Sequence, residues 1–246
     1  MADTILITGA TSGFGAACAR RFAQGGWRLI LTGRRRERLE QLAAELGPCV
    51  AAALPLDVRD RDAVVATIGA LEVDLLLNNA GLALGLEPAW EVDPKDWETM
   101  VDTNVKGVMY CTQALLPGMV ARNRGHVVNI GSTAGRWPYP GGNVYGATKA
   151  FVEQFTRNLR ADLLGTAVRA TYLAPGMAET EFSNVRFKGD AARADRVYAG
   201  ARPLRAEDVA EIVWFVATLP AHVNVNALEV MCVDQAWGHL AVHRRP

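Results

Sequence analysis

Short runs of Val, Ile and Leu alternate with longer amphipathic stretches along almost the whole chain, and this alternation constrains the fold most strongly. Between the runs, apolar residues repeat at helical spacing, as Leu39, Leu42 and Leu46 do within a helix expected over residues 35–46. Strands that alternate with helices form βαβ units and a parallel sheet, so the sequence predicts the α/β class. Seven strands are expected, at residues 4–8, 28–32, 50–56, 73–77, 126–130, 168–173 and 228–233.

The length of the chain and its even composition favour one domain. The chain has 246 residues, half of them hydrophobic, and contains no internal repeat, low-complexity tract or linker. One irregular region, residues 175–205, follows the carboxyl end of an expected strand, where open α/β sheets bind ligands. We therefore predict a single domain over residues 1–246, with a substrate lid that contains helical pieces around residues 175–205.

The charge balance excludes some classes of partner. Lys and Arg number 26, as do Asp and Glu, so no net charge attracts nucleic acid or an anionic membrane. The first residues lack the basic start and apolar run of a signal peptide, and no later stretch is long and apolar enough to cross a membrane, so a cytoplasmic location is expected. The four cysteines and four histidines are scattered, which predicts reduced thiols and no metal site.

A glycine-rich turn joins the first expected strand to the first helix. Glycines let backbone N–H groups approach a pyrophosphate closely, and the helix start adds its positive end. The spacing Gly-x-x-x-Gly-x-Gly differs from the usual dinucleotide fingerprint, and a tight turn without a ligand is the alternative. The turn residues predicted to bind a cofactor are Gly9, Thr11, Ser12, Gly13, Phe14 and Gly15.

Arginines follow the second expected strand, where NAD-binding proteins place an acidic residue for the ribose hydroxyl. Arg34 and Arg35 offer planar guanidinium groups that match the oxygens of a 2′-phosphate, and therefore favour NADP over NAD. The alternative is a solvated basic helix start, because Glu37 and Glu40 follow closely.

Two further strand ends extend this site. Asp57 and Val58 follow the third strand, where a carboxylate can accept a hydrogen bond from the adenine amine. Asn79, Ala80 and Gly81 follow the fourth strand and are predicted to line the cofactor. Because Asn side chains also satisfy turn backbone locally, this second turn could be purely architectural.

Ser132, Tyr145 and Lys149 have the chemistry of a hydride-transfer site. Tyr145 and Lys149 are four residues apart on a helix expected to start near Asn143, so both project from one face. A free tyrosine has a pKa of about 10, and nearby positive charge from Lys149 and an oxidised nicotinamide would lower it. Ser132, just past the fifth strand, could hold the reacting oxygen together with Tyr145.

These motifs together resemble the short-chain dehydrogenase/reductase family over nearly the whole length. They are Thr8-Gly9-x-x-x-Gly13-x-Gly15, Asn78-Asn79-Ala80-Gly81, Asp102-Thr103-Asn104, Gly131-Ser132-Thr133-Ala134-Gly135, Tyr145-x-x-x-Lys149 and Pro175-Gly176. The resemblance implies a Rossmann-like, doubly wound single domain with helices on both faces. It also implies a homo-oligomer, for which we expect a tetramer, with a dimer as the alternative.

The same resemblance implies roles for individual residues. Tyr145 would be the acid/base, Lys149 would bind the ribose and lower the tyrosine pKa, and Ser132 would hold the substrate oxygen. Asn104 would hold a water that connects Lys149 to solvent. Pro175, Gly176 and Thr180 would contact the cofactor, as would Tyr145 and Lys149.

Longer strings are similar to one subgroup, the NADP-dependent 3-hydroxy acid dehydrogenases, also described as L-allo-threonine or serine dehydrogenases. They are residues 79–85, 131–139, 182–190 and 219–226. Substrates of this subgroup carry a carboxylate, for which Arg186 is a planar partner. The alternative is that Arg186 pairs with Glu181 or Asp190 and only holds the lid.

The sequence therefore predicts an NADP-dependent oxidoreductase that transfers hydride at C3 of short 3-hydroxy acids such as L-serine, L-allo-threonine and 3-hydroxypropionate, or reduces the matching semialdehydes. A second reading gives the same residues a bulkier ketone, such as a 3-oxoacyl thioester or a polycyclic alcohol. A third is a non-catalytic NADP-binding sensor, since fold alone never proves function. The intact set of Ser132, Tyr145 and Lys149 argues against a sensor.

Overall fold

The computed structural model describes residues 2–238, and in them the chain forms one parallel seven-stranded sheet with the order β3-β2-β1-β4-β5-β6-β7. The predicted α/β class and the doubly wound, seven-stranded parallel sheet are therefore confirmed. The strand order reverses between β1 and β4, which is where sheets of this kind open a crevice for ligands. The strands are β1 (Thr4–Ile7), β2 (Arg28–Gly33), β3 (Val50–Pro55), β4 (Leu75–Asn78), β5 (Gly125–Ile130), β6 (Val168–Pro175) and β7 (Ala227–Val230).

Most strand ends agree with the sequence to within two residues, and the far end of β7 differs most. The sequence predicts a strand up to residue 233, but β7 ends at Val230. Beyond it the chain turns back over Gly176, whose N–H donates to Val230 O at 2.7 Å, and the side chain of Gln235 accepts from Met177 N at 2.7 Å. Part of the C-terminal tail, residues 239–246, lies outside the described residues.

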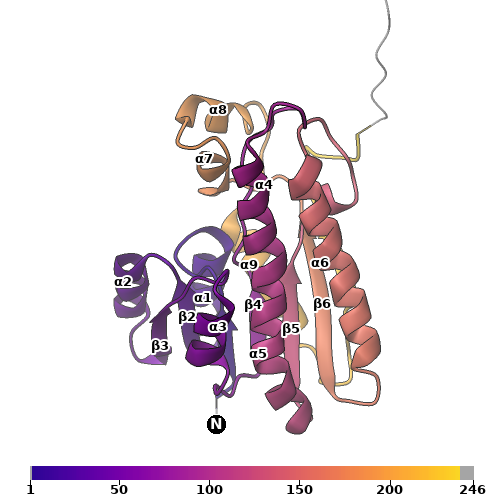
Figure 1. Ribbon diagram of the computed structural model, residues 1–246. Coiled ribbons are helices and arrows are strands. Elements are labelled where there is room, and N and C mark those ends of the chain that lie inside the picture. The colour runs from indigo at the N-terminus through magenta and orange to yellow at the C-terminus, as the bar shows by residue number, and fades with distance from the viewer. Residues whose placement is uncertain (1, 239–246) are drawn as a thin grey trace, which may run out of the picture.

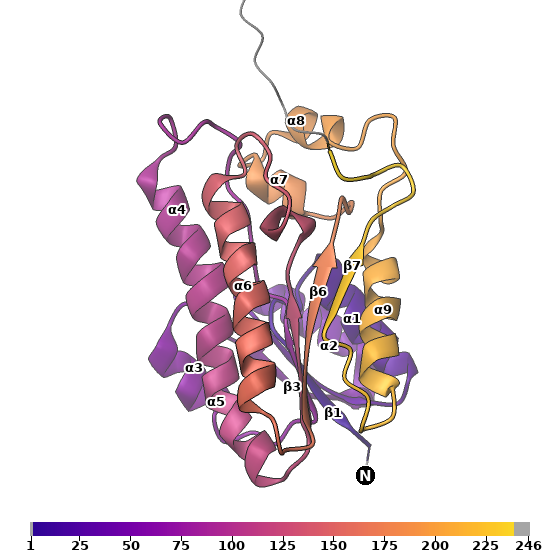
Figure 2. The ribbon, with the colours of Figure 1, turned by 90° about the vertical axis from the view of Figure 1, so that its right-hand side faces the viewer.

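Helices cover both faces of the sheet (Figures 1 and 2). One face packs against α1, α2 and α9, and the other against α3, α5 and α6. The expected helix over residues 35–46 is α2, which begins one residue later. The α-helices are α1 (Gly13–Gln24), α2 (Arg36–Leu46), α3 (Arg61–Ile68), α4 (Pro94–Val101), α5 (Gly107–Ala121), α6 (Asn143–Asp162), α7 (Phe182–Arg186), α8 (Ala191–Arg196) and α9 (Ala206–Thr218).

The central strands carry the core because they are buried on both faces. All residues of β4 and β5 are buried, as expected for parallel strands with a helix layer on each side. Side chains that alternate along β1 divide between two apolar clusters, with Ile5 and Ile7 in one and Leu6 in the other. This core fixes the carboxyl ends of the strands relative to one another, and the predicted site residues lie at those ends.

Residues 175–205 contain the two short helices α7 and α8, which lie beyond the carboxyl ends of β6 and β7 (Figure 2). Hydrogen bonds and ion pairs tie this segment to α4 and to the loop before it. Gly85 N donates to Arg186 O at 2.9 Å, and Lys188 Nζ lies 2.7 Å from Asp96 Oδ2. The irregular pattern in this part of the sequence thus corresponds to short helices that pack across the open end of the sheet.

Candidate active site

A cavity of about 650 Å³ opens at the carboxyl ends of the strands, beneath α7 and α8. It is the place where the sequence motifs meet. Of the predicted site residues, those that line it are Gly9, Thr11, Ser12, Gly13, Phe14, Arg34, Arg35, Asp57, Val58, Asn79, Ala80, Gly81, Ser132, Tyr145, Lys149, Pro175, Gly176, Thr180 and Arg186. Gly15 and Asn104 are not among the lining residues.

The glycine-rich turn is shaped by close backbone approach. Gly9 has a φ of +67°, and a Cβ there would lie 2.9 Å from the Cα of Ala80. A Cβ at Gly15 would lie 2.4 Å from Gly9 O, so Gly15 permits packing of the turn and does not face the cavity. Helix α1 begins at Gly13 with no acidic residue in its first turn, which leaves its N–H groups suited to an anion. The side chain of Thr180 packs against Gly13, where an added Cβ would lie 3.5 Å from Thr180 Cβ.

Asn79 holds this turn in place. Its side chain donates to Thr8 O at 2.9 Å and to Gly9 O at 3.1 Å. Thr8 Oγ1 in turn accepts from the backbone N–H groups of Asn79 and Ala80. The side chain of Asn79 therefore has an architectural role, as the alternative prediction for this turn stated. The turn of Asn79, Ala80 and Gly81 still lines the cavity.

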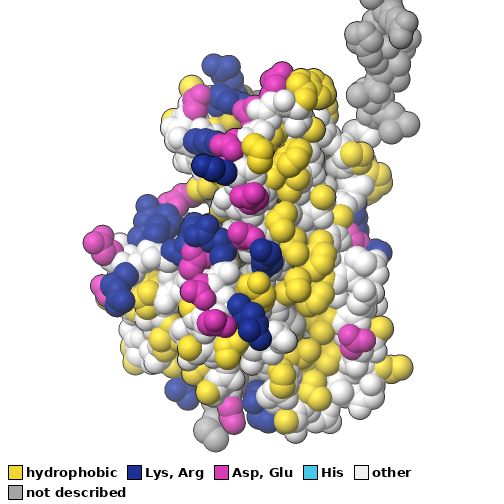
Figure 3. Space-filling view, in the orientation of Figure 1, with side chains coloured by type: hydrophobic (Ala, Val, Ile, Leu, Met, Phe, Trp, Pro, Cys, Tyr) yellow, Lys and Arg dark blue, Asp and Glu magenta, His cyan; other side chains and the backbone are white. Residues whose placement is uncertain are grey.

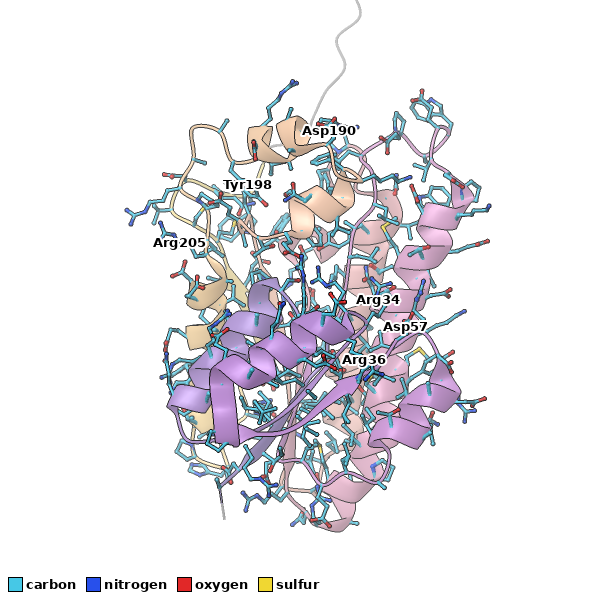
Figure 4. The ribbon with its side chains drawn as sticks, turned by 90° about the vertical axis from the view of Figure 1, so that its left-hand side faces the viewer. Arg34, Arg36, Asp57, Asp190, Tyr198 and Arg205 are labelled. Atoms are coloured by element: carbon cyan, nitrogen blue, oxygen red, sulfur yellow. The ribbon has the colours of Figure 1, made fainter. Side chains whose placement is uncertain are left out.

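The two arginines after β2 lie in different surroundings. Arg34 lines the cavity close to Asp57 (Figure 4). Arg35 instead turns to the glycine-rich turn, where its Nη2 donates to Thr11 Oγ1 at 2.9 Å and to Ser12 Oγ at 2.8 Å. Its Nη1 lies 3.0 Å from Glu181 Oε2. Both arginines thus line the cavity, but the guanidinium of Arg35 is bound to other parts of the chain.

Asp57 already has a partner in this structure. Its carboxylate lies 2.6 Å from Arg59 Nη2 and accepts further hydrogen bonds from Arg59. These hydrogen bonds lower the pKa of the Asp57 carboxyl. Asp57 is therefore ionised at neutral pH, and both of its oxygens can accept hydrogen bonds, for example from an adenine amine.

Ser132, Tyr145 and Lys149 come together at one wall of the cavity. Ser132 lies two residues past the end of β5, and its Oγ accepts from Ala134 N at 3.1 Å. Tyr145 and Lys149 lie one turn apart on α6, which begins at Asn143 as predicted, and they are only 8% and 6% exposed. Lys149 Nζ donates to Ile130 O at 2.9 Å, so the backbone at the end of β5 positions the amine.

Burial dominates the electrostatics of this group. It raises the pKa of Tyr145 to about 12, against the lowering effects of the Arg186 charge and a hydrogen bond to Ser132. Burial lowers the pKa of Lys149 to about 8, so the amine is still mostly protonated at neutral pH. The sequence points to Lys149 as the positive charge near the phenol, and the structure adds Arg186, whose guanidinium carbon lies 5.0 Å from the Tyr145 ring centroid.

Asn104 lies behind the cavity wall, in a π-helical turn (Asp102–Lys106) between α4 and α5. Its Oδ1 accepts from Leu82 N at 2.9 Å, and its Nδ2 donates to Leu82 O at 2.8 Å and to Thr148 Oγ1 at 3.1 Å. A Cβ at Gly81 would lie 3.2 Å from Asn104 Oδ1 and 3.4 Å from Lys149 Nζ. Asn104 therefore holds the backbone beside Lys149, and π turns of this kind are frequent at functional sites.

Arg186 closes the other side of the cavity. Its Nη2 donates to Tyr139 Oη at 3.1 Å, and its guanidinium carbon lies 5.1 Å from the Phe182 ring centroid. The Nε–H of Arg186 is buried without a partner in the described part of the chain. Of the acids that the sequence offered as its alternative partners, Glu181 pairs with Arg35 and Arg38, while Asp190 caps α8.

The lining residues that were not identified from the sequence include two tyrosines and two residues of the C-terminal tail. Tyr139 and Tyr198 present phenol groups, and Gln235 and Trp237 come from the C-terminal tail. Tyr139 lies within residues 131–139, one of the segments that are similar to the 3-hydroxy acid dehydrogenases, so this similarity could have identified it. Tyr198 lies within the predicted lid, residues 175–205, but was not singled out. For Gln235 and Trp237 there was no signal, because only the folded chain brings the tail to the cavity.

Within residues 2–238, no helix is long and apolar enough to span a bilayer. In the same part of the chain, no group of three or more His, Cys, Asp or Glu side chains is arranged to hold a metal ion.

Comparison with known families assigns the chain. The sequence model of the family described as short chain dehydrogenase matches residues 3–191. This chain belongs to the short-chain dehydrogenase family. Among curated relatives, the NADP-dependent 3-hydroxy acid dehydrogenase of Escherichia coli K12 is 58% identical over 98% of this chain and 99% of its own. Sulfoacetaldehyde reductase 2 of Chromohalobacter salexigens is 59% identical over 99% of this chain and 100% of its own.

Solved structures give the same assignment. A closed form of serine dehydrogenase complexed with NADP⁺ superposes with a TM-score of 0.96 at 57% identity, covering 98% of this chain and 100% of that one. A 3-ketoacyl-(acyl-carrier-protein) reductase from Brucella melitensis, complexed with NADH, has a TM-score of 0.82 at 31% identity over 93% of this chain and 96% of that one. The predicted family and fold are confirmed, and the chain is an oxidoreductase of the short-chain dehydrogenase type.

Proposed function

We propose that this chain is an NADP-dependent dehydrogenase of short 3-hydroxy acids, which transfers hydride at C3 of compounds such as L-serine, L-allo-threonine and 3-hydroxypropionate, or reduces the matching semialdehydes. The coarser statement, an oxidoreductase that acts on CH–OH groups, already follows from the family. The finer statement, that the substrate is a short hydroxy acid, rests on Arg186, whose guanidinium group lies beside Tyr145.

The predicted cofactor, NADP, is confirmed by relatives described as NADP-dependent and by the similar structure that contains NADP⁺. The cavity of this chain fits it. The glycine-rich turn leads into the N-terminus of α1, whose first turn has no acidic residue and therefore suits an anion. Arg34 offers a cation just after β2. We assign Arg34, Asp57, Asn79 and Lys149 to its binding, together with the glycine-rich turn. When bound, NADP accepts or supplies the hydride.

The chain's own residues handle the proton. In the reductive direction the Tyr145 hydroxyl donates its proton to the substrate oxygen, and in the oxidative direction it accepts that proton back. The Ser132 hydroxyl donates a second hydrogen bond to the same oxygen, which stabilises the negative charge that develops there. Lys149 and Arg186 place positive charge near the phenol and stabilise its ionised form against the effect of burial.

Arg186 carries the proposal for an acidic substrate. Its guanidinium lies over the ring of Tyr145, and its buried Nε–H has no protein partner among the described residues. A substrate whose reacting oxygen is held by Tyr145 and whose carboxylate is close by along the same short chain can satisfy that donor. Tyr139 holds the other side of the guanidinium and thereby orients it toward the cavity.

A second candidate substrate keeps the anion and changes its chemistry. Two relatives at 59% and 56% identity are described as sulfoacetaldehyde reductases. Sulfoacetaldehyde is an aldehyde with a sulfonate on the neighbouring carbon, so it presents the same pairing of carbonyl and anion as a carboxylate semialdehyde. Arg186 would serve either anion, because both present oxygens in a geometry that a guanidinium can contact twice.

The other readings have weaker support. A bulky ketone would have to pass Phe182, whose ring centroid lies 5.6 Å from that of Tyr145, and would leave the Arg186 charge without a partner. A non-catalytic sensor would not need a tyrosine hydroxyl beside Ser132 in the cavity.

Three predictions from the sequence remain proposals. Residues 175–205 would act as a substrate lid, which their position over the cavity supports. The chain would form a homo-oligomer, preferably a tetramer, and hydrophobic side chains that run along the α4–α5 face support this (Figure 3). Met109 and Val120 on α5 are each 40% exposed. A cytoplasmic location is expected from the sequence alone.

The test of the substrate follows the absorbance of the reduced nicotinamide with NADP⁺ or NAD⁺. The panel contains L-serine, L-allo-threonine, 3-hydroxypropionate, 3-hydroxybutyrate, 2-hydroxyethanesulfonate and a bulky secondary alcohol. Turnover of the small carboxylates with NADP⁺ supports the proposal, and preference for the sulfonate supports the second candidate. Turnover of only the bulky alcohol would overturn both.

An arginine substitution separates the clamp from general effects of charge. Arg186→Ala is expected to raise KM for 3-hydroxy acids by about tenfold or more, because a charge-assisted pair contributes roughly 1.5 to 3 kcal/mol. The matched control is Arg193→Ala, which removes an arginine of α8 that does not line the cavity. An unchanged KM in Arg186→Ala would refute the clamp.

A further inference from the structure

Glu181 joins the covering segment to the cofactor end of the cavity. Its carboxylate lies 3.0 Å from Arg35 Nη1 and 2.6 Å from Arg38 Nη1. Both arginines belong to the start of α2, more than 140 residues earlier in the chain. A single acidic side chain from residues 175–205 thus forms ion pairs with two cations beside the place predicted for a 2′-phosphate.

The remaining donors of Arg35 are also in use. Its Nε and Nη2 donate to Thr11 Oγ1 at 3.1 and 2.9 Å, and Nη2 donates to Ser12 Oγ at 2.8 Å. For Arg34 the structure gives no ion pair within residues 2–238, and its guanidinium faces the cavity (Figure 4). Of these two arginines, only Arg34 is ready for a phosphate, while Arg35 is neutralised by Glu181.

Glu181 is ionised at neutral pH. Partial burial raises the pKa of its carboxyl, and the hydrogen bonds from Arg35 and Arg38 lower it by more, so the pKa lies below its usual value. A carboxylate in this position repels a second anion and occupies the donors that the anion would use. Glu181 and both arginines remain more than 40% exposed, so the solvent weakens this repulsion without removing it.

We infer that Glu181 competes with the 2′-phosphate of the cofactor for Arg35 and Arg38, and that it thereby limits how strongly the enzyme prefers NADP to NAD. This inference rests on the proposed function, because it needs a 2′-phosphate subsite at the start of α2. Removal of the Glu181 charge frees two cations there and leaves the adenosine and pyrophosphate contacts unchanged.

The experiment measures binding of two cofactor fragments by titration calorimetry. The probes are 2′,5′-ADP, which carries the 2′-phosphate, and 5′-ADP, which lacks it. The proteins are the full-length enzyme and its Glu181→Gln and Glu181→Ala variants. The matched control is Glu179→Gln, which removes an exposed carboxylate two residues away that has no ion pair within the described residues.

Both Glu181 variants are expected to bind 2′,5′-ADP about threefold to tenfold more tightly than the parent, because a like charge is removed close to the phosphate. This gain should shrink when the salt is raised to about 0.5 M, since exposed charges are screened. Binding of 5′-ADP should stay within about twofold of the parent, as should both ligands in the Glu179→Gln variant.

The outcomes separate the two levels of the argument. A parent that prefers 2′,5′-ADP, with Glu181 variants of unchanged or weaker affinity, overturns the role of Glu181 and leaves the proposed function standing. If neither the parent nor the Glu181 variants distinguish the two fragments, the 2′-phosphate subsite is overturned and, with it, the inference. The use of two substitutions guards against a misfolded variant, which would lose affinity for both fragments.

Discussion

The catalytic wall (Ser132, Tyr145 and Lys149) and the segment over it (residues 175–205) are held by different forces. The wall stands on β5 and α6, and its side chains are pinned by buried backbone atoms such as Ile130 O. The segment is held largely by surface ion pairs, together with hydrogen bonds such as that from Gly85 N to Arg186 O, and its Glu181 and Lys188 are 44% and 59% exposed. Exposed pairs each contribute about 0 to 1 kcal/mol, whereas a buried donor left without its acceptor costs about 1 to 3 kcal/mol.

This difference implies that the wall is rigid and that the segment controls access to the cavity. The wall keeps the acid/base group in fixed geometry, while the segment can open at modest cost because each of its surface contacts is weak. Substitutions in the wall should therefore change kcat or stability strongly, and substitutions in the segment should change KM and affinity by smaller factors.

The largest effect is expected at Tyr145. Tyr145→Phe removes the hydroxyl that we propose exchanges the proton, and it should lower kcat by about 10²- to 10⁴-fold. The dissociation constant for NADP⁺, measured by quenching of tryptophan fluorescence, should change by less than about threefold, because the ring and its packing remain. Tyr198→Phe is the counterpart from the segment, where the hydroxyl binds Ser183 and Ala178 O, and it should keep kcat within about threefold. Similar losses in both variants would contradict the contrast.

A second test compares two asparagines. Asn104→Ala removes three hydrogen bonds and leaves both backbone groups of Leu82 without partners, so the free energy of unfolding should fall by about 2 to 4 kcal/mol. Asn184→Ala changes an exposed residue of α7 and should cost less than about 0.5 kcal/mol. Urea unfolding of the cofactor-free proteins measures both values. Equal losses would mean that the segment is as firmly held as the wall.

The pH dependence of stability provides a third test. The pKa of Lys149 is about 8 in the folded protein against 10.5 for the free side chain, so between these values the unfolded chain binds a proton that the folded chain has released. Stability from this group therefore rises with pH across that window. Relative to Lys149→Met, the parent should gain about 1 to 3 kcal/mol from pH 7.5 to 10.5, since each pKa unit corresponds to about 1.4 kcal/mol. Groups that both proteins share cancel in this difference, and a flat difference would mean that Lys149 is solvated.

The same contrast explains what the sequence could predict. The wall and the glycine-rich turn come from local patterns, because the strand end before Ser132 and the spacing of four from Tyr145 to Lys149 fix which side chains meet. Their positions followed from periodicity and family motifs. The opposite side of the cavity depends on contacts such as those between Arg186 and Tyr139, which no local pattern encodes.

Arg35 shows where local reasoning reached its limit. From the sequence, Arg35 is predicted to have the same role as Arg34, since both follow β2 and both are cations. In the fold its partner is Glu181, an acid 146 residues away, whose position depends on how residues 175–205 cross the cavity. A charge pair between residues so far apart in the sequence depends on the fold, so local patterns do not predict it. The same is true of Gln235 and Trp237 in the C-terminal tail, which line the cavity.

The smallest expected effect lies where the two regions touch. Tyr139→Phe removes only the hydroxyl that holds Arg186 and leaves the guanidinium over the Tyr145 ring. KM for a 3-hydroxy acid should rise by about twofold to fivefold, because one neutral hydrogen bond contributes about 0.5 to 1.5 kcal/mol, while kcat should stay within about twofold. Steady-state kinetics at neutral pH measures both, with Tyr110→Phe as the control at a partly buried tyrosine that does not line the cavity. A loss in kcat larger than the rise in KM would show that Tyr139 acts on Tyr145 itself, and the division between a rigid wall and an adjustable cover would then fail at the point where they meet.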